Sequence, residues 1–321
     1  MARMPSSRPR GGRVIVLLMA ALPWKASCMN QQHTDQSSHH LEGWEASPHA
    51  RGVHALNEAI YQESRAQAEA ARELLPDAVL NSTATDMGSN VRIWDLYYPT
   101  YNCLLLKERL GRIGDGGKVC CGLRYLLQDR PCLAYSLGSA GDTTFEQEIV
   151  KRTSCQVHTF DHTLSQAVQD AVASTPGISF HPWGVGSPSK GGGLRTLTQI
   201  MADLNHNWID VLKVDIEGHE WELLQDFYAE KDASLPVTQL MVEFHFQNAS
   251  TAFHALDKLL GDGFRVFSVE PNYYCDNGCC AKDLLEFAFI KVSPMGQICS
   301  PRSRAAALRE ALPHGCRGGA V

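Results

Sequence analysis

Strand-like and helix-like segments alternate from Cys132 onward in this 321-residue chain, and that alternation limits the folds open to it. Five short apolar runs are each followed by a segment with helical spacing, which predicts parallel strands joined by right-handed crossovers. The last two strands have only a loop between them, so this pair is expected to be antiparallel. The strands are expected at 133–137, 156–160, 178–183, 211–214, 239–244, 264–269 and 286–292, and the helices at 144–152, 164–173, 194–204, 220–228 and 251–260.

The segment Val211–Trp221, VLKVDIEGHEW, is the most informative part of this pattern. Its apolar run ends abruptly in acids, which is typical of a buried parallel strand that delivers polar groups at its carboxyl end. Ligands bind at that edge of open α/β sheets, so Asp215 and Glu217 are predicted to lie in a binding site. The alternative is a strand followed by a solvated acidic turn. Glu220 is expected to begin the next helix.

Glycines and a further acid follow the first two strands. Gly138 and Gly141 would let the backbone approach a ligand closely where the next helix begins. Asp161 ends the second strand, where an acid in a Rossmann-like unit accepts hydrogen bonds from ribose, and an exposed acid is the alternative. Trp183 or His181 would pack on an adenine ring, and an aromatic residue at a helix–sheet boundary is the alternative. The candidate cofactor-binding residues are Gly138, Ser139, Gly141, Asp142, Asp161, His162, Trp183 and Gly184.

Polar side chains also gather after the fourth and fifth strands, which are predicted to be neighbours. The candidate catalytic residues are Asp215, Glu217, His219, Glu243 and His245. His219 or His245, oriented by a carboxylate, would act as the proton acceptor, although each histidine alone is more often structural. The same group could hold a hard divalent cation. No ligand spacing within it is diagnostic, so no metal ligand is assigned.

Several segments resemble the FkbM-like class I methyltransferases, namely LAYSLGSAGDTTFEQEI, CQVHTFD, WIDVLKVDIEGHEWELL and LMVEFHF. Upstream, LGRIGDGGKVCCG is similar to the branch of that superfamily represented by methyltransferase-like protein 24. The resemblance covers about residues 95–292. It implies a Rossmann-like, seven-stranded α/β class I methyltransferase sheet with an N-terminal helical lead-in, and S-adenosylmethionine as the cofactor.

The resemblance also implies roles for particular positions. Gly138–Gly141 would lie under the methionine moiety, Asp161 would hold the ribose, and Asp215 would lie near the cofactor or the acceptor. The family's glycine loop is more often Asp-x-Gly-x-x-x-Gly, whereas Ser136 stands at the position of that acid in this chain. The candidate substitutes for the acid are Asp142 and Glu146.

The N-terminal segment 1–28 has the layout of a secretory signal. Arginines precede the apolar run Val14–Leu22, and small residues follow it. The run is short for a membrane span, and an uncleaved signal anchor of a single-pass type II protein is the alternative. Eleven cysteines suit an oxidising compartment, and Asn81 and Asn248 begin glycosylation sequons, so we expect a protein of the secretory pathway. The disulfide partners expected are Cys120 or Cys121 with Cys103 or Cys132.

The regions expected along the chain are a signal peptide or anchor at 1–28, a disordered linker at 29–53, a helical or cap lead-in at 54–130, a methyltransferase domain at 131–293 and a disordered tail at 294–321. Within the lead-in, residues 54–75 are rich in helix formers, and Pro76 ends the run. Gly114–Lys118 resembles a phosphate-binding turn superficially, and an ordinary turn is expected there.

The leading expectation is an S-adenosylmethionine-dependent methyltransferase that methylates oxygen on a glycan, small-molecule or protein acceptor. A nicotinamide-dependent oxidoreductase is one rival, because Asp161 suits that cofactor too, but the chain lacks a GxGxxG motif. A catalytically inactive module that keeps the fold is the other, favoured by the altered glycine loop. A formal charge of −6 without a broad basic field argues against a nucleic-acid partner, and membrane contact is expected only through the N-terminal anchor.

Overall fold

The structure is a computed structural model that describes residues 48–80, 95–127, 131–187, 193–229, 233–245, 249–272 and 284–300. The expected signal segment 1–28 and both sequons, at Asn81 and Asn248, lie outside the described residues. No helix among the described residues has both the length and the apolar composition needed to cross a bilayer.

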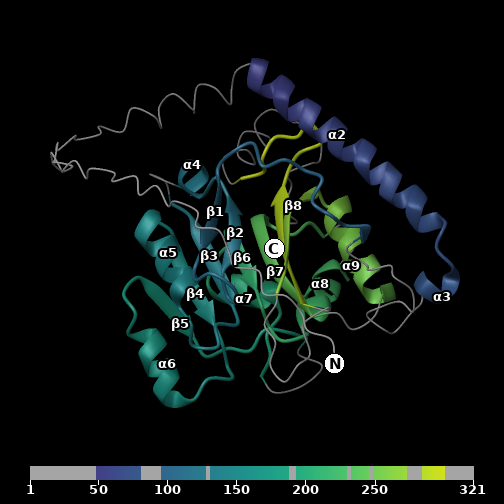
Figure 1. Cartoon of the computed structure of the whole chain (residues 1–321). Helices are drawn as coiled ribbons and strands as arrows, with labels where there is room; N and C mark the ends of the chain where they lie inside the picture. The colour runs from purple at the N-terminus through teal and green to yellow at the C-terminus, as the bar shows by residue number, and fades with distance from the viewer. Residues whose placement is uncertain are drawn as a thin grey trace, which may run out of the picture. The chain divides into compact units, whose positions relative to one another are not determined.

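A mixed seven-stranded sheet forms the core of the fold (Figure 1). Its strand order is β5-β4-β3-β6-β7-β9-β8, in which the strands from β3 to β7 run parallel and β9 is antiparallel to both of its neighbours. The expected Rossmann-like sheet and its antiparallel final pair are therefore confirmed. The strands are β3 (Leu133–Leu137), β4 (Gln156–Phe160), β5 (Ile178–His181), β6 (Ile209–Val214), β7 (Val237–His245), β8 (Phe264–Pro271) and β9 (Leu284–Lys291).

The central strands are buried on both faces, which explains their apolar sequences. β6 is buried along its whole length, and β7 is buried at every residue except its last. The chain first adds β4 and β5 on one side of β3 and then crosses to β6 on the other side. The strand order therefore reverses between β3 and β6, and ligands bind at such switch points in open α/β sheets.

Helices cover both faces of the sheet. One apolar cluster joins α7, α8 and α9 to the face that carries Leu212, and a second joins α4 and α5 to the face that carries Val211. Successive strand residues point to opposite faces, so these two neighbours in β6 contribute to different layers. The helices are α4 (Leu123–Leu127), α5 (Thr144–Arg152), α6 (Gln166–Ala173), α7 (Leu197–Asp203), α8 (Glu220–Tyr228) and α9 (Ala249–Gly261).

The lead-in packs on the sheet through polar anchors. The long helix α2 (Pro48–Glu73) is followed by the short α3 (Asp77–Leu80), and a buried ion pair of 2.6 Å joins Glu58 of α2 to Arg265 of β8. The linker expected at 29–53 is wrong for residues 48–53, which form the first turns of α2. Proline suits the first position of a helix, and buried packing of Ala50 overrides the weak helix propensity of this stretch.

A two-stranded hairpin, β1 (Lys107–Leu110) and β2 (Lys118–Cys121), follows in the lead-in and contacts β7 and β9. The Cys103–Cys121 disulfide ties it to the preceding segment, and this pair was among those expected. A second disulfide, Cys132–Cys155, was not expected. It joins the residues that precede β3 and β4, and these strands start side by side. Cys120 is a buried free thiol.

The described part of the C-terminal segment is packed. Val292 pairs with Ile298, and Cys299 is fully buried. The disordered tail expected at 294–321 is therefore wrong for residues 294–300, because an antiparallel bridge and apolar burial hold them on the domain. The remainder, 301–321, lies outside the described residues.

Candidate active site

A cavity of about 640 Å³ lies at the carboxyl ends of β3, β4, β6 and β7, and its size suits a small-molecule site. Most of the candidate residues line this cavity, namely Gly138, Ser139, Asp142, Asp161, His162, Trp183, Asp215, Glu217, His219, Glu243 and His245. Two described candidates, Gly141 and Gly184, are not among its lining residues. The topological switch point thus gathers both sets of candidate residues around one space.

The glycines of the loop after β3 serve close packing. A Cβ on Gly138 would come within 1.7 Å of the Asp215 carbonyl oxygen, and the residue has a φ of 78°. A Cβ on Gly141 would come within 2.7 Å of Val168, which belongs to α6. Gly184 is similarly enclosed by Leu194. At Gly138 the added atom would meet backbone, whereas at Gly141 and Gly184 it would meet side chains, and of the three only Gly138 lines the cavity.

Asp161 folds the glycine loop around its carboxylate. Its Oδ2 accepts hydrogen bonds from the backbone N–H groups of Ser139 and Ala140, both at 3.0 Å, and from the Ser139 hydroxyl at 3.3 Å. Its Oδ1 accepts from the Thr163 N–H at 2.9 Å and from the Thr163 hydroxyl at 2.7 Å. Burial alone would raise the pKa of Asp161, but these donors outweigh it and lower the pKa.

The cavity is apolar beside Asp161. Phe160, Trp183, Val185 and Leu194 line it there, and the Arg195 guanidinium lies 3.9 Å from the Trp183 ring centroid. Phe160, Trp183, Val185 and Leu194, here called the aromatic slot, give this part of the cavity an apolar lining that suits a flat heterocycle.

The opposite part of the cavity is acidic and is organised by Glu220. This fully buried carboxylate accepts hydrogen bonds from the N–H groups of Ile216 and Gly218, at 3.0 and 3.1 Å. It also lies 3.2 Å from His245 Nδ1. Glu217, at the tip of the turn, has a φ of 55°, an uncommon value for a residue other than glycine. Glu220 therefore fixes both the acidic turn and the neighbouring histidine.

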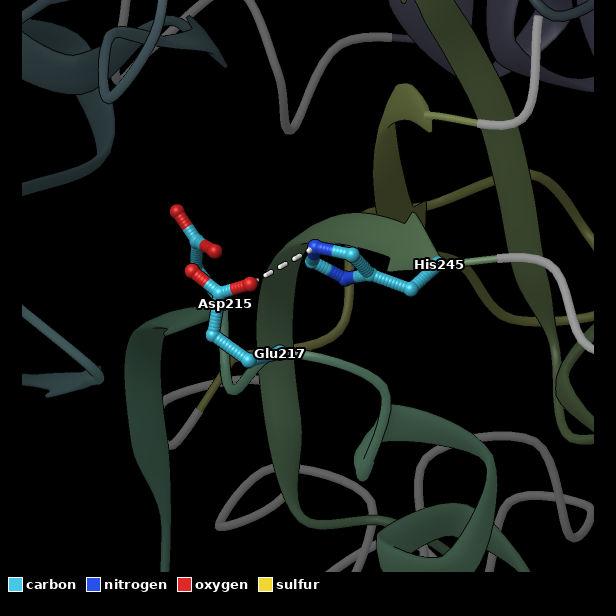
Figure 2. A group of neighbouring side chains, drawn as sticks. All are labelled: Asp215, Glu217 and His245. Atoms are coloured by element: carbon cyan, nitrogen blue, oxygen red, sulfur yellow. Dashed lines mark ion pairs between the residues drawn. The ribbon is translucent and has the colours of Figure 1, made fainter. Parts of the chain in front are cut away.

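Figure 2 shows Asp215, Glu217 and His245 turned toward one another. The Nε2 atom of His245 lies 3.3 Å from the Glu217 carboxylate, and the Trp221 indole donates a hydrogen bond to the His245 carbonyl. Burial would lower the pKa of His245, but the hydrogen bond and charge of Glu220 raise it to about 9. His219 also lines the cavity, but its Nδ1 pairs with Glu222 of its own helix, so the structure favours His245 as the oriented histidine.

A buried lysine completes this end of the site. Lys118 of β2 lies 3.3 Å from Asp215, 3.5 Å from Glu243 and 2.5 Å from Glu286. Burial alone would raise the pKa of Asp215, but the ammonium groups of Lys213 and Lys118 outweigh that penalty and lower the pKa. Burial and the carboxylates of Asp215 and Glu286 raise the pKa of Glu243 to about 8.

Sequence reasoning missed Lys118, Lys213, Glu286 and the role of Glu220. The sequence predicts a turn at Lys118, whereas the residue opens the short strand KVCC, because a lysine between glycines and apolar residues is a weak signal. Glu220 had been assigned only to the start of a helix. No local pattern could show that its carboxylate turns back to bind the preceding loop.

The atoms of Asp215, Glu217 and His245 that could ligate a cation lie within 4.8 Å of one another. Lys118 and Lys213, however, place ammonium groups 3.3 and 3.8 Å from Asp215. A divalent cation would have to bind against both of these charges. This charge environment does not suit a metal, so we assign no metal ligand and derive no step through one.

Comparison with known proteins gives a consistent result. A family model described as a methyltransferase domain matches residues 72–291. The probable methyltransferase-like protein 24 of Rattus norvegicus is 30% identical over 172 residues, covering 51% of this chain and 42% of that protein. The Homo sapiens protein of the same name is 28% identical over 132 residues, covering 38% and 35%. The chain thus matches less than half the length of these curated relatives.

Solved structures show weaker likeness. The Methanococcus jannaschii fibrillarin pre-rRNA processing protein is 17% identical with a TM-score of 0.33, covering 52% of this chain and 68% of that one. The METTL16 MTase domain is 11% identical with a TM-score of 0.35, covering 53% and 63%. At these scores the strand order of the sheet remains the better guide to the fold.

Proposed function

This chain belongs to the methyltransferase domain family, and from that premise we propose that it is an S-adenosylmethionine-dependent methyltransferase that methylates a hydroxyl group. The acceptor is a small molecule, a glycan or a protein side chain. One observation carries the proposal. A single cavity joins the glycine loop and Asp161 on one side to Asp215, Glu217 and His245 on the other.

The residues present fit the cofactor. The aromatic slot suits the adenine, and Asp161 suits the ribose once ribose hydroxyls replace the Ser139 and Thr163 hydroxyls as donors. The backbone donors of Ser139 and Ala140 would keep Asp161 in place during that exchange. When bound, the cofactor supplies an electrophilic methyl group on a sulfonium. The carboxylates of the acidic end favour that positive charge.

His245 is the proton acceptor in this proposal. Glu220 holds its Nδ1, which leaves Nε2 directed to the acidic end of the cavity. The neutral imidazole would take the proton of the acceptor hydroxyl at Nε2 while the bound cofactor supplies the methyl group to that oxygen. Glu220 and Glu217 stabilise the imidazolium that forms. The walls of the cavity align the two reactants, which is the larger part of the catalytic requirement.

We also propose that the protein works in the secretory pathway. The disulfides Cys103–Cys121 and Cys132–Cys155 support this location, because such bonds persist in oxidising compartments. Expression of the full chain followed by digestion with a glycosidase tests it. A shift in mass is expected from glycans on Asn81 or Asn248.

The rival functions predict different cofactor binding. The antiparallel β9 and the missing GxGxxG motif disfavour a nicotinamide-dependent oxidoreductase. An inactive module that keeps the fold would bind neither cofactor nor product. Calorimetric titration of the purified protein with S-adenosylmethionine, S-adenosylhomocysteine and NAD separates all three. Binding of the first two without NAD is expected, and binding of NAD alone would overturn the proposal.

A further inference from the structure

Lys118 is a buried charge that the proposed reaction does not use. Its side chain is 1% exposed, and its residue lies in β2, outside the seven-stranded sheet. Its ammonium is shared by carboxylates from β6, β7 and β9. An unpaired charge in such a position would cost several kcal/mol or more by rough estimate. Lys118 therefore depends on these carboxylates to stay charged in the interior. The group of Lys118, Asp215, Glu243 and Glu286 is here called the lysine cluster.

The alternation of side chains along β2 places Lys118 against the seven-stranded sheet. Lys118 and Cys120 are two apart on β2 and so share a face, and the Cys120 thiol lies 3.4 Å from the Gln239 side chain of β7. The preceding loop is tight, because a Cβ on Gly117 would come within 2.0 Å of the Arg112 carbonyl oxygen. The sequence GDGGK thus ends in a lysine whose direction is fixed by the strand and the loop together.

A second contact fixes the other side of the cluster. The Asn272 amide donates hydrogen bonds to Glu243 at 2.7 Å and to Asp115 of the hairpin loop at 3.1 Å. Glu243 is thereby held between Asn272 and Lys118. The hairpin consequently binds the catalytic edge of the sheet at two points.

We propose that Lys118 is a positioning residue of the active site. It ties Asp215 and Glu243, which line the cavity, to Glu286 behind them, and so sets the orientation and the net charge of the wall that a cationic methyl donor meets. The charged groups that face Lys118 are Asp215 from β6, Glu243 from β7 and Glu286 from β9, and Lys213 of β6 pairs with the same Asp215. This inference rests on the proposed function, because it assumes that the donor binds in the cavity.

The charge of the cofactor provides a direct probe. S-adenosylmethionine carries a sulfonium charge that S-adenosylhomocysteine lacks, so the ratio of their dissociation constants reports the electrostatic potential in the cavity. A loss of the Lys118 charge makes the wall more negative and favours the sulfonium. A loss of the Glu286 charge has the opposite effect. A purely structural role would change both affinities together and leave their ratio constant.

The experiment compares Lys118→Met, Lys118→Arg, Glu286→Gln and the double variant Lys118→Met/Glu286→Gln by calorimetry at pH 8.5 with both ligands. Lys118→Met should shift the ratio toward S-adenosylmethionine by about threefold or more, and Glu286→Gln should shift it the other way. The double variant should return close to the parent ratio, because a charge and its counter-charge are removed together. Lys118→Arg keeps the charge and should leave the ratio unchanged.

Lys107→Met is the matched control, since Lys107 lies on the same hairpin but donates to the Phe267 carbonyl instead of a carboxylate. It should leave the ratio within error. If Lys118→Met fails to fold, Glu286→Gln and the double variant still test the charge balance. Constant ratios in variants that bind both ligands would overturn this inference alone. A parent protein that binds neither ligand would overturn the proposed function itself.

Discussion

Gly138 and Asp215 meet at the centre of the active site with no room for a side chain between them. A Cβ on Gly138 would lie 1.7 Å from the Asp215 carbonyl oxygen, and the Asp215 N–H donates to the Leu137 carbonyl. The glycine loop after β3 and the acidic turn after β6 are consequently one packed unit. The proposed cofactor-binding and acceptor-binding parts of the cavity therefore depend on the same local structure.

Gly138→Ala should lower the free energy of unfolding by about 2–4 kcal/mol and weaken binding of S-adenosylhomocysteine. The added methyl group meets backbone atoms, which cannot move aside as a flexible side chain can. Chemical denaturation and calorimetry measure the two effects. Gly261→Ala is the matched control, because a Cβ there has no neighbour within 4 Å, and it should neither destabilise the protein nor weaken binding.

Asp161→Asn should reduce the affinity for S-adenosylhomocysteine by about 100-fold, in line with the loss of charged hydrogen bonds. An amide can accept at one atom only, so it cannot hold the backbone donors of Ser139 and Ala140 and the Thr163 donors together. Calorimetric titration measures the change. Asp170→Asn, on the exposed side of α6, is the control. Equal affinities for Asp161→Asn and the parent would remove Asp161 from the cofactor site.

His245→Gln should leave the affinity for S-adenosylhomocysteine within about threefold and lower turnover about 100-fold, as expected for the loss of a proton acceptor. Transfer of a tritiated methyl group from S-adenosylmethionine to an acceptor fraction measures turnover. His254→Gln, on the exposed surface of α9, serves as the control and should retain activity.

The same histidine predicts how turnover depends on pH. The pKa of His245 is raised to about 9, so most of the free protein carries the imidazolium at neutral pH. The neutral base becomes more abundant as the pH rises, and the rate should increase from pH 7 toward 9 before it levels off. A rate that stays constant over this range would exclude His245 as the proton acceptor.

His158 packs against His181 and His206 next to the aromatic slot, and this group predicts a loss of stability in acid. Burial, with smaller effects from His181 and His206, lowers the pKa of His158 from 6.5 to about 4. The unfolded chain therefore binds more protons than the folded one between these values. The stabilising contribution is complete above about pH 6.5 and is lost as the pH falls toward 4. Thermal unfolding should show this slope, and His158→Gln should reduce it.

Removal of the Cys132–Cys155 disulfide should lower the free energy of unfolding by about 3 kcal/mol, because a loop with a sequence separation of 23 is released in the unfolded chain. The double variant Cys132→Ser/Cys155→Ser tests this by chemical denaturation. Cys120→Ala removes a buried thiol without opening a crosslink, and it should cost about 1 kcal/mol. Equal losses in the two variants would show that the crosslink itself contributes nothing.

The sheet could be predicted because its strands carry their own signals. The runs at 133–137 and 156–160 and the helices at 144–152 and 220–228 coincide with the structure. Other predicted boundaries differ from the observed ones by a few residues, because hydrogen-bond pairing determines where a strand ends. β7 extends to His245, for example, since that residue pairs with Leu284 of β9. Such a partner is distant in sequence and leaves no mark on the local pattern.

The candidate site could be predicted only in part, for the same reason. Asp215 follows β6 and His245 ends the neighbouring parallel strand β7, so topology alone brings the two residues to one edge of the sheet. Lys118 contacts Asp215 although the two residues are 97 positions apart in the sequence. Lys118 belongs to a hairpin that the alternation of helices and strands does not predict. Its position depends on tertiary packing, which composition and periodicity do not encode.

The lysine cluster also has a consequence for biosynthesis. The ribosome makes Lys118 first and Glu286 last, with Asp215 and Glu243 between them. A nascent chain therefore exposes an incomplete set of charges until β9 emerges and inserts between β7 and β8. Among the described strands, the last to be synthesised is thus also the one that completes the lysine cluster. A chain that ends before residue 284 would leave the facing edges of β7 and β8 without their shared partner strand.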